Sequence, residues 1–178
     1  MITNIADFNN NPDWFFILVS ALVVEFIVIT LTRYAGKKPY FNVTALNQWY
    51  NKFGVIAVGS DVFSVLIGIM GARYIYTLTG LHGALYFLLI LVAFQLAHDL
   101  FFYEFVIKPM RKGENQMIDV FKNYAKENGE KILVADAMIV LATALGGSLL
   151  KALPHHITVA TGFVSLYSLC YILYTRGP

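Results

Sequence analysis

The feature that most constrains this chain is a series of five long apolar stretches. A helix needs about 20 consecutive apolar residues to cross the ~30 Å hydrocarbon core of a bilayer. Inside a bilayer no water satisfies the backbone, so each stretch is expected to be helical. We therefore predict an all-α integral membrane bundle forming a single transmembrane domain over 1–178, with spans at about 14–32, 55–75, 85–107, 132–150 and 155–174.

The composition agrees with a membrane protein. Of the 178 residues, 58% are hydrophobic and only 13% are charged, and the mean hydropathy is +0.63. A soluble domain of this length would need more polar surface to cover its core. The single cysteine, Cys170, excludes an internal disulfide. A net charge of +2 gives no reason to expect a nucleic-acid partner.

The basic residues are distributed unevenly between the two ends of the predicted spans. Eleven of the 13 lie in the first loop, the third loop or the C-terminal tail, including Lys37, Lys38 and Arg176. Only Arg73 and Lys151 lie at the opposite ends of spans. The positive-inside rule then predicts an outside or lumenal N-terminus and a cytosolic C-terminus. Basic loops of this kind can also bind anionic lipid headgroups.

Both cytosolic loops contain a predicted amphipathic helix. Over residues 115–128, apolar side chains such as Ile118, Phe121 and Tyr124 recur at helical spacing between charged ones. Residues 45–53 follow the same pattern, with Trp49 and Tyr50 as expected interface anchors. We interpret both helices as lying in the membrane interface, with docking of a partner as the alternative.

A shift of 75 residues superposes parts of the chain on each other. Gly54 then matches Gly129, and Asp61 matches Asp136, the single acid of each of these two spans. This pattern predicts a parallel two-hairpin repeat in which spans two and three correspond to spans four and five.

Five acidic residues lie inside the predicted spans. An acid at the bilayer centre costs roughly 2.5–3.5 kcal/mol, so a group of them needs a reason. With a rise of about 1.5 Å per residue, all five fall in the half of the bilayer near the basic loops, as one layer. Glu104 is expected to pair with Lys108 at the surface. The candidates for binding a proton or a cation are Glu25, Asp61, Asp99 and Asp136, with His98 as the adjacent base.

Small and polar residues share helical faces with these acids. Small residues allow membrane helices to approach closely, so Asp61 and Asp136 are expected to point into the bundle. The same glycine and serine faces would permit a homo-oligomer. The polar residues expected to support the acids by hydrogen bonding are Gln95, Tyr103, Ser64 and Thr143.

No motif for hydrolysis, nucleotide binding or zinc-dependent proteolysis occurs in the chain, which disfavours an enzyme and indicates no cofactor. Whether the acids bind a metal stays open, although His98 is the one imidazole at their depth. Two functional classes remain. The first is a small transporter or channel-like protein that binds protons or a cation. The second is a structural or assembly protein whose acids only hold the bundle together.

Three segments carry a resemblance to known proteins: WYNKFGVIAVGSDVFSVLIGIMGARYIY (49–76), AHDLFFYEFVIKP (97–109) and NQMIDVFKNYAKENGEKILVADAMIV (115–140). In this order they resemble a group of small multi-pass membrane proteins encoded by large nucleocytoplasmic DNA viruses of algae and protists. The resemblance implies a viral protein of a virion inner membrane or a host membrane. It implies no biochemical activity.

Overall fold

The computed structural model describes residues 2–35 and 43–175, which form seven α-helices without a β-strand. Five of the helices are long and apolar enough to cross a membrane. This confirms the predicted fold class, with each span within a few residues of its expected position. Lys37, Lys38 and Arg176, which contribute to the predicted charge asymmetry, lie outside the described residues. The five helices are α1 (Asp13–Tyr34), α3 (Val55–Thr79), α4 (Ala84–Phe102, continued by the π-helical turn η2, Tyr103–Ile107), α6 (Lys131–Lys151) and α7 (His155–Tyr174).

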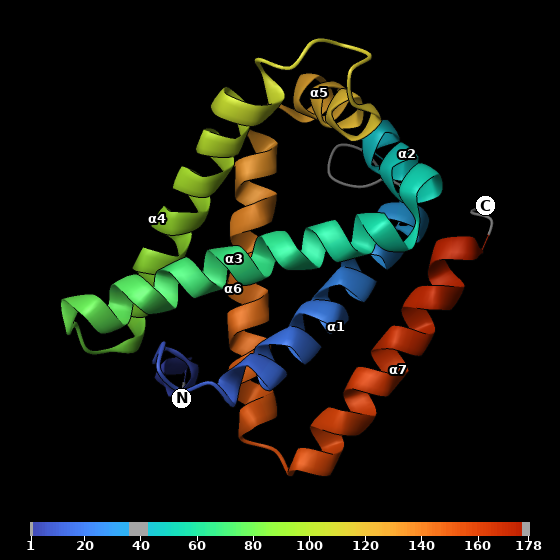
Figure 1. Ribbon diagram of the computed structural model, residues 1–178. Coiled ribbons are helices and arrows are strands. Elements are labelled where there is room, and N and C mark those ends of the chain that lie inside the picture. The colour runs from blue at the N-terminus through green and yellow to red at the C-terminus, as the bar shows by residue number, and fades with distance from the viewer. Residues whose placement is uncertain (1, 36–42, 176–178) are drawn as a thin grey trace.

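Two short amphipathic helices lie together at one end of the bundle (Figure 1), and we call this end the α2–α5 face. They are α2 (Thr44–Phe53) and α5 (Gln116–Asn128), close to the two predicted interfacial segments. Asn115 caps α5, because its Oδ1 accepts from the backbone N–H of Met117 at 2.8 Å. The 3-10 turn η1 (Ile2–Ile5) lies at the other end of the bundle, the N-terminal face.

The long helices pack through small residues. Helix α1 contacts α3, α6 and α7, while α4 contacts α3 and α6. A Cβ built on Gly71 of α3 would lie 2.0 Å from the Phe94 ring of α4, and one on Gly147 would lie 3.4 Å from the Cα of Ile17 in α1. These contacts bear out the expected role of the small-residue faces: they let α4 and α1 approach closely.

Large apolar side chains cover the outside of the bundle. Phe63, Phe105, Phe163 and Tyr174 are each about two-thirds exposed or more. On a soluble protein a surface of this kind would be unfavourable, whereas lipid tails solvate it without cost. The outer faces of the long helices are therefore suited to contact with a bilayer.

The two amphipathic helices join the long helices through glycines of nearly identical conformation. Gly54, between α2 and α3, has φ 52° and ψ −123°, and Gly129, between α5 and α6, has φ 53° and ψ −132°. Such positive φ values favour glycine. The 75-residue likeness therefore extends to backbone geometry for these helix–glycine–helix units. It does not extend to the next helices, because α4 packs on α3 and α6 whereas α7 packs mainly on α1.

Candidate functional site

Two carboxyl groups from different long helices meet near the α2–α5 face, and we call them the acidic pair. Glu25 of α1 and Asp61 of α3 lie within hydrogen-bonding reach of each other. The Tyr50 Oη donates to Glu25 Oε1 at 3.0 Å, and the Trp49 Nε1 donates to Asp61 Oδ2 at 3.0 Å. Two carboxyl groups can hydrogen-bond to each other only when one of them carries a proton. The pair is therefore able to share a proton between its two carboxyl groups.

The two aromatic donors correct an expectation from the sequence. Trp49 and Tyr50 were predicted to be interface anchors, yet each is only 2% exposed. Burial, reinforced by the negative charges of Glu25 and Asp61, raises the pKa of the Tyr50 phenol well above its usual range. The phenol consequently stays protonated and remains a donor to Glu25. The apolar face of α2 points into the bundle instead of into lipid.

The acidic pair belongs to a larger group that spans the bundle. Asp136 of α6 lies close enough to Asp61 and to Asp99 of α4 for their charges to act on it. The structure thus brings together one acid from each of four helices, and we call Glu25, Asp61, Asp99 and Asp136 the acidic layer. The charged groups that act on Glu25 and on Asp136 are other carboxylates of the layer.

On α4, neutral or weakly basic groups surround Asp99. Gln95 Nε2 donates to Asp99 Oδ1 at 2.8 Å, and His98 Nδ1 lies 3.2 Å from the same oxygen. Gln95 is 2% exposed and fits against Gly68 of α3, where a Cβ would lie 2.2 Å from its Oε1. The His98 side chain is 22% exposed, which places the edge of the layer at the surface of the bundle.

The remaining residues predicted from the sequence have different positions. Tyr103 begins the π-helical turn η2, where Lys108 N donates to Tyr103 O at 2.9 Å, and it is 40% exposed. Its expected side-chain hydrogen bond to Asp99 is absent among the described residues, although the Tyr103 backbone N–H still donates to Asp99 O. Thr143 is fully buried and Ser64 is half-buried. Glu104 pairs with Lys108 at 2.7 Å on the surface, as expected.

A second polar group, at the N-terminal face, was missed by the sequence reasoning. Asp13 Oδ1 lies 2.6 Å from Lys151 Nζ, and Asp13 Oδ2 lies 3.6 Å from Arg73 Nη2. Asp13 is 1% exposed and Arg73 is fully buried, with its guanidinium 4.8 Å from the Trp14 ring centroid. We call Asp13, Arg73 and Lys151 the ion-pair cluster.

The N-terminal segment covers the ion-pair cluster. Arg73 donates to the backbone carbonyls of Asp7 and Asn10, and Lys151 donates to that of Asn4. Ile5 and Ala6 in the same segment are fully buried. One sequence signal could have indicated this arrangement. Arg73 and Lys151 are the only basic residues predicted at this end, and Asp13 opens the first span.

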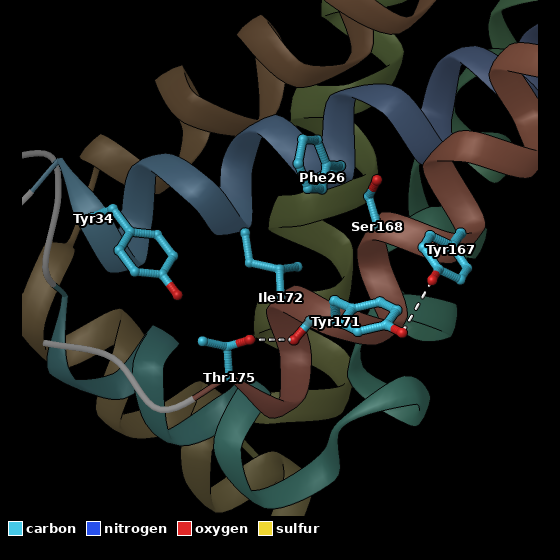
Figure 2. A pocket seen from close by; sticks show the side chains of 7 residues that line it. All are labelled: Phe26, Tyr34, Tyr167, Ser168, Tyr171, Ile172 and Thr175. Carbon is cyan, nitrogen blue, oxygen red and sulfur yellow. Dashed lines mark hydrogen bonds between the residues drawn. The ribbon is translucent and has the colours of Figure 1, made fainter.

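Within the described part of the chain, the side chains of the acidic layer do not form a metal cluster. Within residues 2–35 and 43–175, no group of three or more His, Cys, Asp or Glu side chains is placed to hold a metal ion. A groove of about 350 Å³ lies between α1 and α7, and Figure 2 shows Tyr34, Tyr167 and Tyr171 around it. Tyrosines of this kind are typical of a membrane interface.

No protein-family model, curated protein or solved structure matches this chain.

Proposed function

We propose that this multi-pass membrane protein binds protons at the acidic layer and couples their binding to transport. The observation that carries the proposal is the acidic pair itself. Glu25 and Asp61 lie within hydrogen-bonding reach, and their other partners are the uncharged donors Tyr50 and Trp49. Carboxylates held together without a compensating cation are costly to ionise together. Such a pair binds and releases one proton more readily than its two carboxyl groups both lose their protons.

Protons are favoured over metal cations at this site. A hard cation takes six or more oxygen ligands, and the lone pairs of its carboxylates must point toward it. In the acidic pair, N–H and O–H donors from Trp49 and Tyr50 already occupy carboxylate oxygens. The lack of a three-ligand group in the described part of the chain argues in the same direction.

The rest of the layer supplies a route for the proton. Asp136 interacts with both Asp61 and Asp99, and Asp99 contacts the partly exposed His98. We propose that Asp136 and Asp99 relay the proton between the acidic pair and the imidazole of His98, since the charges of Asp61 and Asp99 act on Asp136. We further propose that the α2–α5 face is cytosolic, in agreement with the predicted charge asymmetry.

The test is proton flux in reconstituted vesicles that contain a pH-sensitive dye. Wild-type protein is expected to dissipate an imposed pH gradient, and Asp61→Asn is expected to abolish this flux while the protein stays folded. Glu104→Gln is the matched control, because Glu104 is exposed and pairs only with the exposed Lys108 in its own helix turn. If wild-type protein carries no flux under any imposed gradient, with or without added solutes, the proposal is wrong.

A second candidate is a structural or assembly protein of a virion inner membrane or a host membrane. One observation favours it. Tyr50, Trp49 and Gln95 already satisfy carboxyl oxygens of the layer, as expected for a network that only joins helices. Large exposed apolar side chains also leave room for a homo-oligomer. In this case Asp61→Asn would change unfolding or oligomer assembly, and wild-type protein would carry no flux.

A further inference from the structure

The first turn of α2 is held by a carboxylate from α5. Glu127 Oε1 accepts from Thr44 N and Glu127 Oε2 accepts from Ala45 N, both at 3.0 Å. The first amides of a helix have no partner within the helix, and an acid placed there also interacts favourably with the helix dipole. Glu127 thus joins the start of α2 to the last turn of α5. Because its carboxylate is exposed on the α2–α5 face, the contact can open without disturbing the core.

Helix α2 carries both donors of the acidic pair. Its Trp49 ring packs against Phe121 of α5 with centroids 4.7 Å apart, and Phe121 in turn meets Phe102 of α4 at 6.1 Å. Trp49 and Tyr50 therefore cover Asp61 and Glu25 from the α2–α5 face with an aromatic layer. A movement of α2 would increase the access of water to the acidic pair from this side, since Glu25 is 5% exposed and Asp61 is half-buried in the present arrangement.

The two glycine junctions allow such a movement. Gly54 and Gly129 interrupt the helical backbone at the points where α2 meets α3 and α5 meets α6. At both glycines the backbone already departs from helical geometry. Helix α2 or α5 can therefore change its angle without breaking the intrahelical hydrogen bonds of α3 or α6. Helices α2 and α5 can consequently tilt while the aspartates of α3 and α6 stay in place.

We infer that α2 and α5 form one interfacial lid over the acidic pair and that Glu127 is the positioning residue that keeps the lid closed. Glu127 acts through Trp49 and Tyr50, which it does not touch. Loss of its carboxylate frees the start of α2 and admits water to Glu25 and Asp61. This inference rests on the proposed function and names how access to its site is controlled.

The experiment measures access directly with a cysteine reporter. Cys170, the one cysteine of the chain, is replaced in Cys170→Ser, and Asp61→Cys is added as the reporter. The protein in nanodiscs is treated with a charged, membrane-impermeant methanethiosulfonate, and the labelling rate is followed by mass spectrometry. Ser64→Cys, one turn further along α3, serves as a second reporter if Asp61→Cys does not fold.

Removal of the Glu127 carboxylate should accelerate labelling. We expect Glu127→Ala to raise the labelling rate about tenfold. Loss of hydrogen bonds to a charged group shifts the equilibrium of local opening by roughly that factor. Glu127→Asp, which keeps the charge on a shorter side chain, should restore most of the protection. Glu114→Ala is the matched control, because Glu114 accepts from Arg111 N within its own loop at 3.1 Å. Its removal should leave the rate unchanged.

Two results would overturn the inference. One is an equal labelling rate with and without the Glu127 carboxylate at both reporters. The other is equal acceleration at Ala72→Cys, a fully buried position toward the N-terminal face, since Glu127 would then act by loosening the whole bundle. Labelling measures access of the reagent to a cysteine thiolate and does not require proton flux across the membrane, so these outcomes are separate from the flux test. Absence of flux in wild-type protein would end the proposed function and leave the lid measurement unchanged.

Discussion

The two ends of the bundle bury charge in opposite ways. At the N-terminal face, the ion-pair cluster places two cations, Arg73 and Lys151, on one buried carboxylate, Asp13. Near the α2–α5 face, the acidic layer places four carboxyl groups together with neutral donors and a single imidazole, His98. The ion-pair cluster therefore pairs opposite charges, whereas the carboxyl groups of the acidic layer are next to one another and to uncharged donors.

This difference separates a structural role from a functional one. Charges that compensate one another hold the N-terminal segment, α3 and α6 in a single arrangement. Under the proposed function, the carboxyl groups of the acidic layer hold protons, which arrive and leave. The same physical cost, burial of charge in an apolar bundle, is then met by pairing at one end and by protonation at the other.

The largest expected effect comes from breaking the ion-pair cluster. Asp13→Asn removes the only carboxylate among its members, so the fully buried Arg73 and the half-buried Lys151 both lose their ion-pair partner. The free energy of unfolding should fall by about 3–5 kcal/mol, as when one partner of a buried pair is removed. Reversible unfolding in mixed micelles measures this change. A loss no larger than that for a surface acid such as Glu114→Gln would mean that the cluster is solvated.

A smaller effect is expected from the packing that fixes the distance between α3 and α4. Helix α3 carries Arg73 of the ion-pair cluster and Asp61 of the acidic layer, and α4 carries Asp99 of the acidic layer. In Gly71→Ala the added Cβ would lie 2.0 Å from the Phe94 ring, so α3 and α4 must separate. We expect a loss of about 1–3 kcal/mol in the same assay. Gly59→Ala on α3 is the control, since no heavy atom lies within 4 Å of its Cβ, and alanine should stabilise the helix by up to about 1 kcal/mol. Equal effects of the two substitutions would contradict this account of the contact.

The smallest loss of stability is expected for Glu25→Gln, which tests whether the acidic layer lacks a cation. The amide keeps an oxygen that can accept from Tyr50 and a donor for Asp61, and it removes one acid from the layer. At neutral pH the free energy of unfolding should stay within about 1 kcal/mol of the wild-type value or rise, because an uncompensated buried acid is lost. Its effect is therefore expected to be opposite in sign to that of Asp13→Asn. A loss comparable to that of Asp13→Asn would mean that Glu25 has a cationic partner.

Much of the acidic layer could be predicted from the sequence because depth in a membrane follows from chain position. A helix rises a fixed distance per residue, so Glu25, Asp61, Asp99 and Asp136 could be assigned to one level before any contact was known. Their donors could not be predicted in the same way. Trp49 and Tyr50 belong to a short helix whose angle to the bundle depends on Gly54. An aromatic residue near the end of a span has the same sequence pattern whether it is a lipid anchor or a buried donor.

The ion-pair cluster was inaccessible to the sequence for a related reason. Asp13, Arg73 and Lys151 come from three helices, and their pairing depends on a short N-terminal segment that folds over them. Nothing in the local pattern of residues 2–11 predicts that Ile5 and Ala6 are buried, since the segment is too short for a periodic signal. The π-helical turn that begins at Tyr103 was likewise not predicted. It lies in the backbone just before Pro109 and has no distinct sequence pattern.

The five long apolar helices and the two amphipathic helices follow from the sequence alone, because they depend on apolar length and helical period. Which side chains meet depends on the tertiary structure. It joined Glu25 to Asp61, gave both of them donors from α2, and paired Asp13 with the two cations. These contacts depend on helix crossing angles and on the glycine junctions. They join residues that are far apart in the chain, so they leave no local pattern in the sequence.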